Sequence, residues 1–334
     1  MTMVDVDQGI DQGIAWHYGD PLREQRWLAD GTGVVALGNR EVVRIGGADR
    51  ATLLNLLGTQ KLDALAPGES SSTYLLDPQG HIAYFLALVN APDAIWGWTE
   101  PGCGAPLASH LTRMRFRLDV NIDLRPDLGV VWAGKPQSEP GTNSGPVRSG
   151  TPNCLGGWEC FLPQETIASG QCVDRLGGHP AGLWAYTARR IEAGVVRVGV
   201  DTDHRTLPNE VGVPSENLAL NKGCYPGQET VARVHNVGAP PRRLVRLHLD
   251  GSQDRLLESG TELRLAGDPS HVVGWIGSMA YHHELGPIAL GLIKRETDDS
   301  ATFLADGIAA SAEALVTRDA GLHVRFTPGA KRLK

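Results

Sequence analysis

The sequence has no long apolar run, no excess of basic residues and no dense set of cysteines. The densest apolar stretch, IAYFLALV, ends at Val89 and is far shorter than the roughly 20 residues that cross a bilayer as a helix. The formal net charge of -7 at pH 7 does not suit a general surface for nucleic acid or anionic membranes, although the final KRLK is basic. We therefore expect neither DNA nor a membrane as a partner.

An export signal is also missing from the start of the chain. The first residues, MTMVDVDQGIDQGI, carry acids where such a signal needs a basic start and then an apolar stretch, which predicts a cytoplasmic protein. The cysteines are odd in number and far apart, at Cys103, Cys154, Cys160, Cys172 and Cys224. Without close C-x-x-C pairs, we expect free thiols and no metal site.

Length and composition predict an ordinary globular protein with two or three packed units. Hydrophobic residues make up 41% of the 334 residues and charged residues 21%. We expect an α+β protein in five segments: a flexible tail over 1–14, an α+β unit over 15–133, a mobile loop over 134–153, a second α+β unit over 154–240, and a C-terminal β-barrel over 241–330. The loop is predicted from its Gly, Pro, Ser and Thr. The short, regularly spaced strands of the last segment predict a small barrel or a sandwich, and the family resemblance given below implies the barrel.

Local patterns predict several elements of the first unit. Two short strands lead into a helix near Ala48, whose inner side would carry Leu53, Leu54, Leu56 and Leu57. STYLLDPQGHIAYFLALV predicts a β-hairpin, since two apolar runs flank turn residues. LASHLTRMRFRLDVNIDL predicts a helix and then a strand with alternating Phe116, Leu118, Val120 and Ile122. In the second unit, GLWAYTARRIEAG predicts a helix that ends at Gly194.

The stretch NKGCYPGQETVARVHNVG places one cysteine among turn residues. Pro226 and Gly227 suit the centre of a type II turn, and the residues that follow predict a helix ending at Gly238. Cys224 would then precede a helix N-terminus. The helix dipole and the neighbouring Lys222 both favour a thiolate, so we expect a thiol pKa below the free value of about 8.5.

A second interpretation of this stretch needs no chemistry. Gly223, Cys224 and Gly227 would be small because the chain turns sharply, and Lys222 would be solvated. A Cys–His pair requires a histidine brought close by the fold, because His235 lies two turns along the same predicted helix. The residues alone leave both interpretations open.

The segment KGCYPGQE resembles the signature of the YgfZ family, folate-binding proteins related to the T-protein of the glycine cleavage system. RRIEAGVVRVGVDTDHRTLPNEVGV is similar to the T-protein stretch that contains E-A-G and then P-x-E, with Glu192 and Glu210 at a similar separation. VVGWIGSMAY and PIALGLIKR resemble its C-terminal barrel. The resemblance implies a T-protein-like fold, with two interleaved α+β units around a central folate cavity and a C-terminal barrel.

The resemblance also implies a ligand, tetrahydrofolate or a related reduced folate, and residues that bind it. Glu192 takes the position of the glutamate that holds the pterin, whose amino group and ring N–H a carboxylate can accept together. A solvated glutamate in the last turn of a helix is the alternative, although a negative charge is slightly unfavourable there. Lys222, Gln228 and Tyr84 are the other expected folate contacts.

One departure from T-proteins bears on the reaction. Tyr84 stands where they carry a catalytic aspartate, and a tyrosine with a pKa near 10 is a poor substitute for a carboxylate at neutral pH. The resemblance therefore implies an accessory factor for iron–sulfur protein assembly or repair, with Cys224 as its reactive thiol, Lys222 tuning it, and folate and iron–sulfur proteins as partners. The alternatives are a tetrahydrofolate-dependent aminomethyl- or methyltransferase, and a folate-binding or tRNA-modification accessory protein in which Cys224 is structural.

Overall fold

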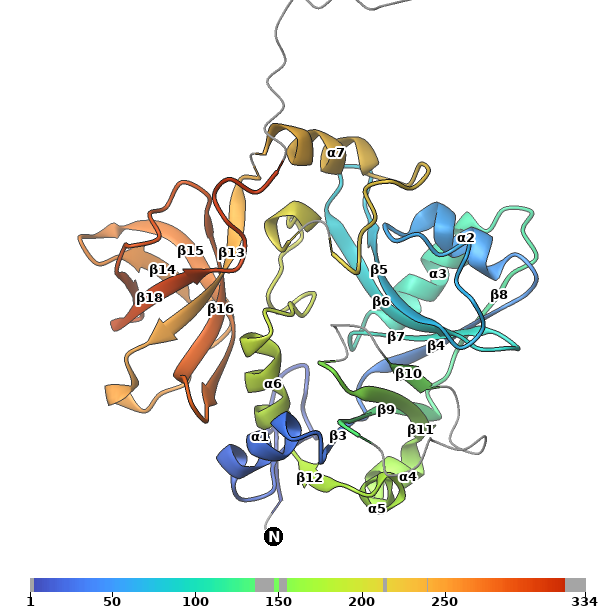
Figure 1. Cartoon of the computed structure of the whole chain (residues 1–334), viewed down its shortest axis with the longest axis horizontal. Coiled ribbons are helices and arrows are strands. Elements are labelled where there is room, and N and C mark those ends of the chain that lie inside the picture. Colours follow the sequence, from blue (N-terminus) through green and yellow to red (C-terminus); the bar gives the residue numbers. More distant parts are fainter. Residues whose placement is uncertain (1–2, 136–146, 150–154, 213–214, 239, 322–334) are drawn as a thin grey trace, which may run out of the picture.

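The computed structural model describes residues 3–135, 147–149, 155–212, 215–238 and 240–321, which form two five-stranded sheets and a closed barrel around a central helix (Figure 1). This helix, α6 (Leu183–Glu192), lies between the sheets and the barrel. Its first half packs against the sheets through Leu183, Ala185 and Tyr186, and its second half packs against the barrel through Ala188 and Ile191. The predicted α+β class with a C-terminal barrel is confirmed.

The first sheet is antiparallel and carries two helices on one face. Its strands, in spatial order, are β5 (Ser70–Leu76), β6 (Ile82–Asn90), β7 (Ile95–Thr99), β4 (Glu41–Gly46) and β8 (Asn121–Leu124). The helices α2 (Arg50–Leu57) and α3 (Gly104–Met114) cover that face. Leu53, Leu54 and Leu57 are buried beneath α2, whereas Leu56, also expected inside, is 50% exposed because it is rotated away from that face.

The hairpin formed by β5 and β6 agrees with the sequence, but the strand expected from Phe116 does not form there. Phe116 is 81% exposed and has a φ of 47°, so it belongs to a turn after α3. The Arg115 side chain donates to the Val120 carbonyl at 2.6 Å across that turn. Strand β8 begins only at Asn121, because the alternating pattern spans a helix end and a turn.

The second sheet combines strands from both predicted α+β units. Its order is β10 (Val147–Ser149), β11 (Trp158–Pro163), β9 (Leu128–Ala133), β3 (Gly33–Leu37) and β12 (His179–Ala181). Only the pairing of β12 with β3 is parallel among these described strands. The helices α4 (Gln164–Ala168) and α5 (Gln171–Leu176) pack against this sheet. The boundary expected at residue 133 therefore falls inside the second sheet, whose strands come from both sides of it.

Part of the segment expected to be a mobile loop is a strand. Arg148, in β10, is fully buried, and its guanidinium lies 2.8 Å from the carboxylate of the equally buried Glu159. The indole of Trp98 donates to the same Glu159 oxygen at 2.7 Å. Residues 136–146 and 150–153 of the expected loop lie outside the described residues.

The N-terminal segment, expected to be a flexible tail, is tied to the rest of the molecule. Strand β1 (Val4–Asp5) pairs with β2 (Ala15–His17), and α1 (Pro21–Ala29) follows, capped by Asp20. The Asp11 carboxylate accepts two hydrogen bonds from Arg197, and Arg197 also donates to Glu100 at 2.7 Å. This nearly buried cluster of charges joins the tail to both predicted units.

The barrel closes by hydrogen bonds around its full circumference, which leaves no free strand edge. Its strands, in spatial order, are β13 (Arg242–Leu249), β16 (Gly286–Lys294), β15 (Asp268–His282), β14 (Glu262–Leu265), β17 (Phe303–Ala305) and β18 (Ile308–Ala314). A core that includes Val245, Leu263, Ile276 and Phe303 fills it. The first barrel strand begins directly after Pro241.

Candidate functional site

The cysteine-containing stretch forms a turn followed by helix α7 (Gln228–Val237), which lies across the ends of β5 and β6 (Figure 1). The Gln228 amide donates to the Tyr225 carbonyl at 3.2 Å, and Gly227 has φ 77° and ψ 0°, the values of the third residue of a type II turn. Gly238 ends the helix in the left-handed conformation. The local sequence signals thus predict this segment correctly, and Cys224 precedes the turn as an exposed residue.

The turn rests on the tip of the β5–β6 hairpin at very short range. A Cβ atom added to Gly227 would lie 2.6 Å from the Cα of Gly80 and 2.9 Å from the Asp77 carbonyl oxygen. A Cβ on Gly80 would lie 2.9 Å from the Cβ of Thr230, in α7. Both glycines are therefore required by close approach as well as by their positive φ angles.

The hairpin tip is itself held by side-chain hydrogen bonds. The Asp77 carboxylate accepts from the amides of Gln79 and His81 at 2.9 and 2.8 Å, and the His81 ring lies 2.9 Å from its other oxygen. Partial burial opposes ionisation of Asp77, but the hydrogen bonds from His81 outweigh it and hold the pKa of this carboxyl below its ordinary value. These hydrogen bonds hold the hairpin tip in place beneath the cysteine turn.

Lys222 anchors the other end of the turn. Its ammonium donates to the carbonyl oxygens of Asn55, Gly58 and Gln60 at 2.6, 2.6 and 2.9 Å, so it caps the C-terminal end of α2. Burial lowers the pKa of Lys222 to about 8. All three donors are used in this way, a structural role that the sequence did not reveal. The expected influence of Lys222 on Cys224 or on folate stays a prediction.

The remaining neighbours of Cys224 are also fixed. Tyr225 is buried in a cluster with Tyr74, Leu218 and Val231, and burial raises the pKa of its hydroxyl to about 12. The Gln228 side chain donates to the Lys222 carbonyl at 3.4 Å, which closes the turn. Cys224 is therefore the one residue of the K-G-C-Y core whose functional group the structure leaves facing solvent.

The other described cysteines have different surroundings. Cys160 and Cys172 are buried, Cys103 is half-buried, and all four described cysteines are free thiols. Burial raises the pKa of Cys160 to about 12 and also raises the pKa values of Cys103 and Cys172. A raised pKa disfavours the thiolate, the reactive form, at all three positions. Cys154 lies outside the described residues.

A cavity of about 270 Å³, called the central cavity below, lies between the end of α6 and strand β5. Its walls are formed by Tyr74, Gly194, Val195, Val196, Val211, Ser215, Glu216 and Asn217. The Asn217 amide donates to the Tyr74 hydroxyl at 2.9 Å and accepts from Ser72 at 2.5 Å. The volume is just below the roughly 300–1,000 Å³ of common small-molecule sites, so the cavity suits a ring system or one end of a longer ligand.

The cavity and the cysteine turn share one stretch of chain. Ser215, Glu216 and Asn217 line the cavity, and the next residues lead to Lys222 and Cys224. This stretch is bound to the end of α2, because the Gln60 side chain donates to the Glu216 carbonyl at 2.6 Å. Tyr74 lines the cavity and belongs to the cluster that buries Tyr225.

The structure separates the residues that the sequence placed together at a folate site. Glu192 ends α6, where its carboxylate accepts from Arg189 and lies 3.6 Å from the His282 ring, towards the barrel. Tyr84 is on the helix-covered face of the first sheet, its ring 5.9 Å from that of His110. Lys222 and Gln228 meet in the cysteine turn. None of these four is among the residues that line the described central cavity.

The second glutamate of the T-protein-like stretch is structural. Glu210 is fully buried and ends a short 3₁₀ helix, η3 (Pro208–Glu210), where it accepts from the Leu207 amide at 2.9 Å. It also accepts from Arg242, the first residue of the barrel, at 2.9 Å. Arg242 also forms an ion pair with Asp203. Burial alone would raise the pKa of Asp203, but the hydrogen bonds and charge of Arg242 hold that pKa far below its usual range. The pairs fasten the start of the barrel to the segment around η3, which is itself bound to β6, because the Ile82 amide donates to the Thr206 carbonyl at 2.8 Å.

The described ranges hold neither a metal-binding cluster nor a membrane-spanning helix. No group of three or more His, Cys, Asp or Glu residues there is arranged to hold a metal ion. No helix in the same ranges is long and apolar enough to cross a membrane. The expected cytoplasmic location stays a prediction.

Comparison with known proteins adds a family context to this geometry. The chain is 29% identical to the mitochondrial iron-sulfur cluster assembly factor IBA57 of Homo sapiens over 256 residues, which cover 68% of this chain and 67% of that protein. It is 27% identical to a probable aminomethyltransferase of Natronomonas pharaonis over 291 residues, 79% of each chain. No family model matches the sequence.

A solved structure supplies the fold. The crystal structure of glycine cleavage system aminomethyltransferase T from Bartonella henselae superposes with a TM-score of 0.75 and covers 96% of this chain and 95% of that one, at 17% identity. The chain has the aminomethyltransferase fold. Its relatives include both iron–sulfur assembly factors and aminomethyltransferases.

Proposed function

We propose that this protein is a folate-binding accessory factor for the assembly or repair of iron–sulfur proteins, with Cys224 as its reactive residue. The observation that carries the proposal is the geometry of the turn. Lys222, Tyr225, Gly227 and Gln228 all make contacts that fix the backbone, and only the Cys224 thiol is presented to solvent. If this segment served only to form a tight turn, its exposed position 224 would not require a cysteine.

The relatives support the proposed process. A similar protein is described as an iron-sulfur cluster assembly factor, and others as aminomethyltransferases. An exposed thiol on a rigid support can contact a client protein directly, as a ligand to iron or as a partner in thiol exchange. The small surrounding residues leave room for such a protein, since nothing lies within 4 Å of a Cβ on Gly223.

Tetrahydrofolate is proposed as the ligand of the central cavity. Tyr74 and Asn217 supply a fixed pair of polar groups, and Glu216 adds a carboxylate that can accept from the amino group and ring N–H of a pterin. Glu192, the expected pterin ligand, is two residues from Gly194 on the cavity wall. It would reach a ligand only after its carboxylate leaves Arg189.

The folate part of the proposal is tested by calorimetry with tetrahydrofolate and the purified full chain. Tyr74→Phe removes one hydroxyl from the cavity and should weaken binding by about tenfold, from the loss of a buried hydrogen bond. Tyr281→Phe, in the barrel, is the matched control and should bind normally. Absence of binding to the wild-type chain would remove folate from the account.

An aminomethyltransferase is the second candidate, favoured by the fold and by several relatives. The position of Tyr84 speaks against it, because this side chain lies on the helix-covered face of the first sheet, with its ring 5.9 Å from that of His110, and it does not line the cavity. Turnover of a protein-bound aminomethyl donor with tetrahydrofolate separates the two candidates. We expect binding without turnover, whereas turnover that disappears in Glu192→Gln would establish the transferase.

A further inference from the structure

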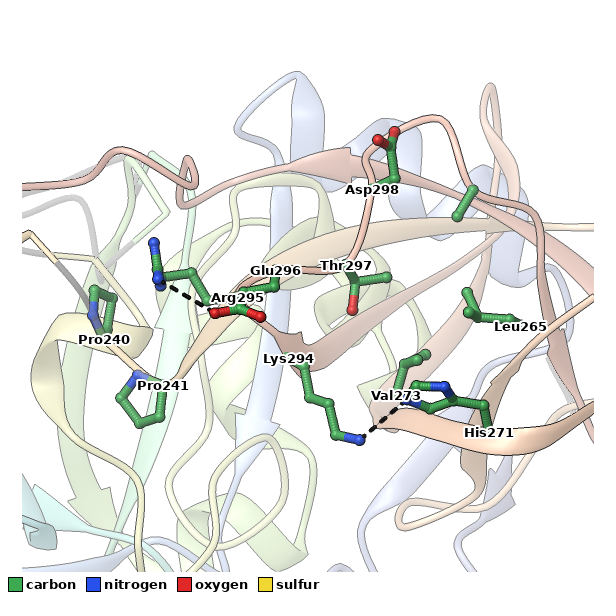
Figure 2. Close-up of a pocket in the computed structure, with 11 residues that line it drawn as sticks. Pro240, Pro241, Leu265, His271, Val273, Lys294, Arg295, Glu296, Thr297 and Asp298 are labelled. Carbon is green, nitrogen blue, oxygen red and sulfur yellow. Dashed lines mark hydrogen bonds and ion pairs between the residues drawn. The ribbon is translucent and has the colours of Figure 1, made fainter. Parts of the chain in front are cut away.

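A second and larger cavity, of about 550 Å³, opens at one end of the barrel (Figure 2). It shares no lining residue with the central cavity. Its walls come from the link between α7 and β13, from the end of β16 and the loop after it, and from β14 and β15. The volume lies in the range of ordinary small-molecule sites.

The base of this barrel pocket is apolar. Leu265 and Val273 reach it from β14 and β15, and Ala301 reaches it from the loop before β17. Pro240 and Pro241 lie on the opposite side (Figure 2). Such a surface favours a ligand with an apolar body, because burying that body removes apolar area from water.

A positive charge stands at the edge of the apolar base. The Lys294 ammonium lies 3.4 Å from Nε2 of His271, and both side chains are exposed (Figure 2). Among the described residues, Lys294 has no carboxylate within ion-pair distance. An exposed ammonium without a carboxylate partner can form a charge-assisted hydrogen bond with an anionic group on a ligand.

The carboxylates around the pocket are already paired. The Glu296 carboxylate lies 3.6 Å from the Arg295 guanidinium, and that of Asp298 lies 3.8 Å from Arg318. Each carboxylate therefore has an arginine close by. Lys294 has no such ion-pair partner among the described residues. This arrangement selects an anion over a cation.

The pocket wall is built in advance of any ligand. Fully buried Arg243 donates to the carbonyls of Arg295 and Thr297 at 3.2 and 2.8 Å, and Arg318 donates to the Thr297 carbonyl at 3.0 Å. The Arg295 amide donates to the Pro241 carbonyl at 3.1 Å, which joins the two sides. A preformed wall lowers the ordering cost of binding.

We propose that this barrel pocket is a second ligand site, which binds a small anion with an apolar body, such as a medium-chain or aromatic carboxylate. The anionic group lies against Lys294 and His271, and the body covers Leu265, Val273 and Ala301. The site is independent of folate and of Cys224, so it stands or falls separately from the proposed function.

The test is calorimetric titration of the full chain with octanoate, supported by displacement of the fluorescent probe anilinonaphthalene sulfonate. Lys294→Gln keeps most of the side-chain length but removes the charge, and it should weaken octanoate binding by about tenfold. Lys61→Gln changes an exposed lysine far from the pocket and should bind like wild type. Equal affinity in the wild type and in Lys294→Gln would overturn the proposal.

A second variant tests the apolar base. Ala301→Leu fills part of the cavity and should also reduce octanoate binding, whereas Ala309→Leu, at an exposed position of β18, should not. Thermal unfolding of each variant shows that the barrel is intact. Octanoate that binds with the same affinity after the cavity is filled would place the ligand elsewhere and contradict the proposal.

Discussion

Gly227 in the cysteine turn and Gly80 in the β5–β6 hairpin lie in direct backbone contact, with space for a Cβ atom on neither. A Cβ on Gly227 would come within 2.6 Å of the Gly80 Cα. This contact places the chain before α7 on the hairpin tip. The β5–β6 hairpin, whose Gly80 is 147 residues before Gly227, thereby fixes the position of Cys224 relative to the first sheet.

Gly227→Ala is expected to destabilise the protein by about 2 kcal/mol, because the new side chain meets the hairpin backbone and the φ of 77° is unfavourable for alanine. Urea unfolding measures the effect. Gly223→Ala is the matched control: a Cβ there meets nothing within 4 Å, so the unfolding midpoint should hardly change. Equal midpoints for both variants would show that the contact is not close.

Lys222→Met should lower the free energy of unfolding by about 1–3 kcal/mol, because three partly buried carbonyls at the end of α2 lose their donor. Lys61→Met removes an exposed lysine nearby and should be close to neutral. If Lys222→Met had the same free energy of unfolding as the wild type, water would be able to replace the ammonium as the donor to these carbonyls at no cost in stability.

The same lysine gives a pH dependence. Because burial lowers the pKa of Lys222 from 10.5 to about 8, the folded state holds fewer protons than the unfolded state between these values. The contribution of Lys222 to the free energy of unfolding therefore increases as the pH rises from about 8 to 10.5. Below pH 8 the side chain is charged in both states, and the full cost of burying the ammonium is present. The difference in unfolding free energy between wild type and Lys222→Met should grow in favour of wild type over this window, and a constant difference would contradict the shift.

Asp11→Asn should destabilise the protein by about 3 kcal/mol, because it leaves the nearly buried Arg197 with one acid fewer. Burial raises the pKa of Asp11, but the hydrogen bonds and charge of Arg197 outweigh this and lower it overall. Its contribution is thus present above its unfolded pKa of 3.8 and lost as pH falls through the lower folded value. Asp7→Asn, at an exposed position, is the control; if the two variants unfold alike at neutral pH, the tail is not anchored.

In a Cys154→Ser background, which keeps only the four described cysteines, alkylation of the native protein by a maleimide should show one fast thiol. Cys224 is exposed, while Cys160 and Cys172 are buried and Cys103 is half-buried. Cys224→Ser should remove the fast phase, and Cys103→Ser should leave it. Persistence of the fast phase when Cys224→Ser is added to the same background would show that another described cysteine, and not Cys224, is the accessible thiol.

Elements formed by neighbouring residues were predictable from the sequence. The type II turn at Pro226 and Gly227, the helix that ends at Gly238 and the hairpin at Asp77 all depend on local preferences, which need no knowledge of the rest of the fold. The resemblance to T-proteins supplied the barrel and the overall class, which the comparison with a solved structure confirms.

Contacts between distant segments were not predictable in the same way. Arginine normally indicates a surface position, so neither Arg148 nor Arg197 could be recognised as buried until their acidic partners were in place. Tyr74 and Asn217, which meet at the central cavity, are 143 residues apart, and neither carries a motif. The three carbonyls that hold Lys222 belong to the main chain and leave no mark on the sequence.

The most direct measurement is the activity of an iron–sulfur dehydratase in cells that lack this gene and carry wild type, Cys224→Ser or Cys103→Ser at equal expression. The account predicts rescue by wild type and by Cys103→Ser, and failure of Cys224→Ser. Rescue by Cys224→Ser to the wild-type level would contradict the account and make Cys224 a residue of the turn alone.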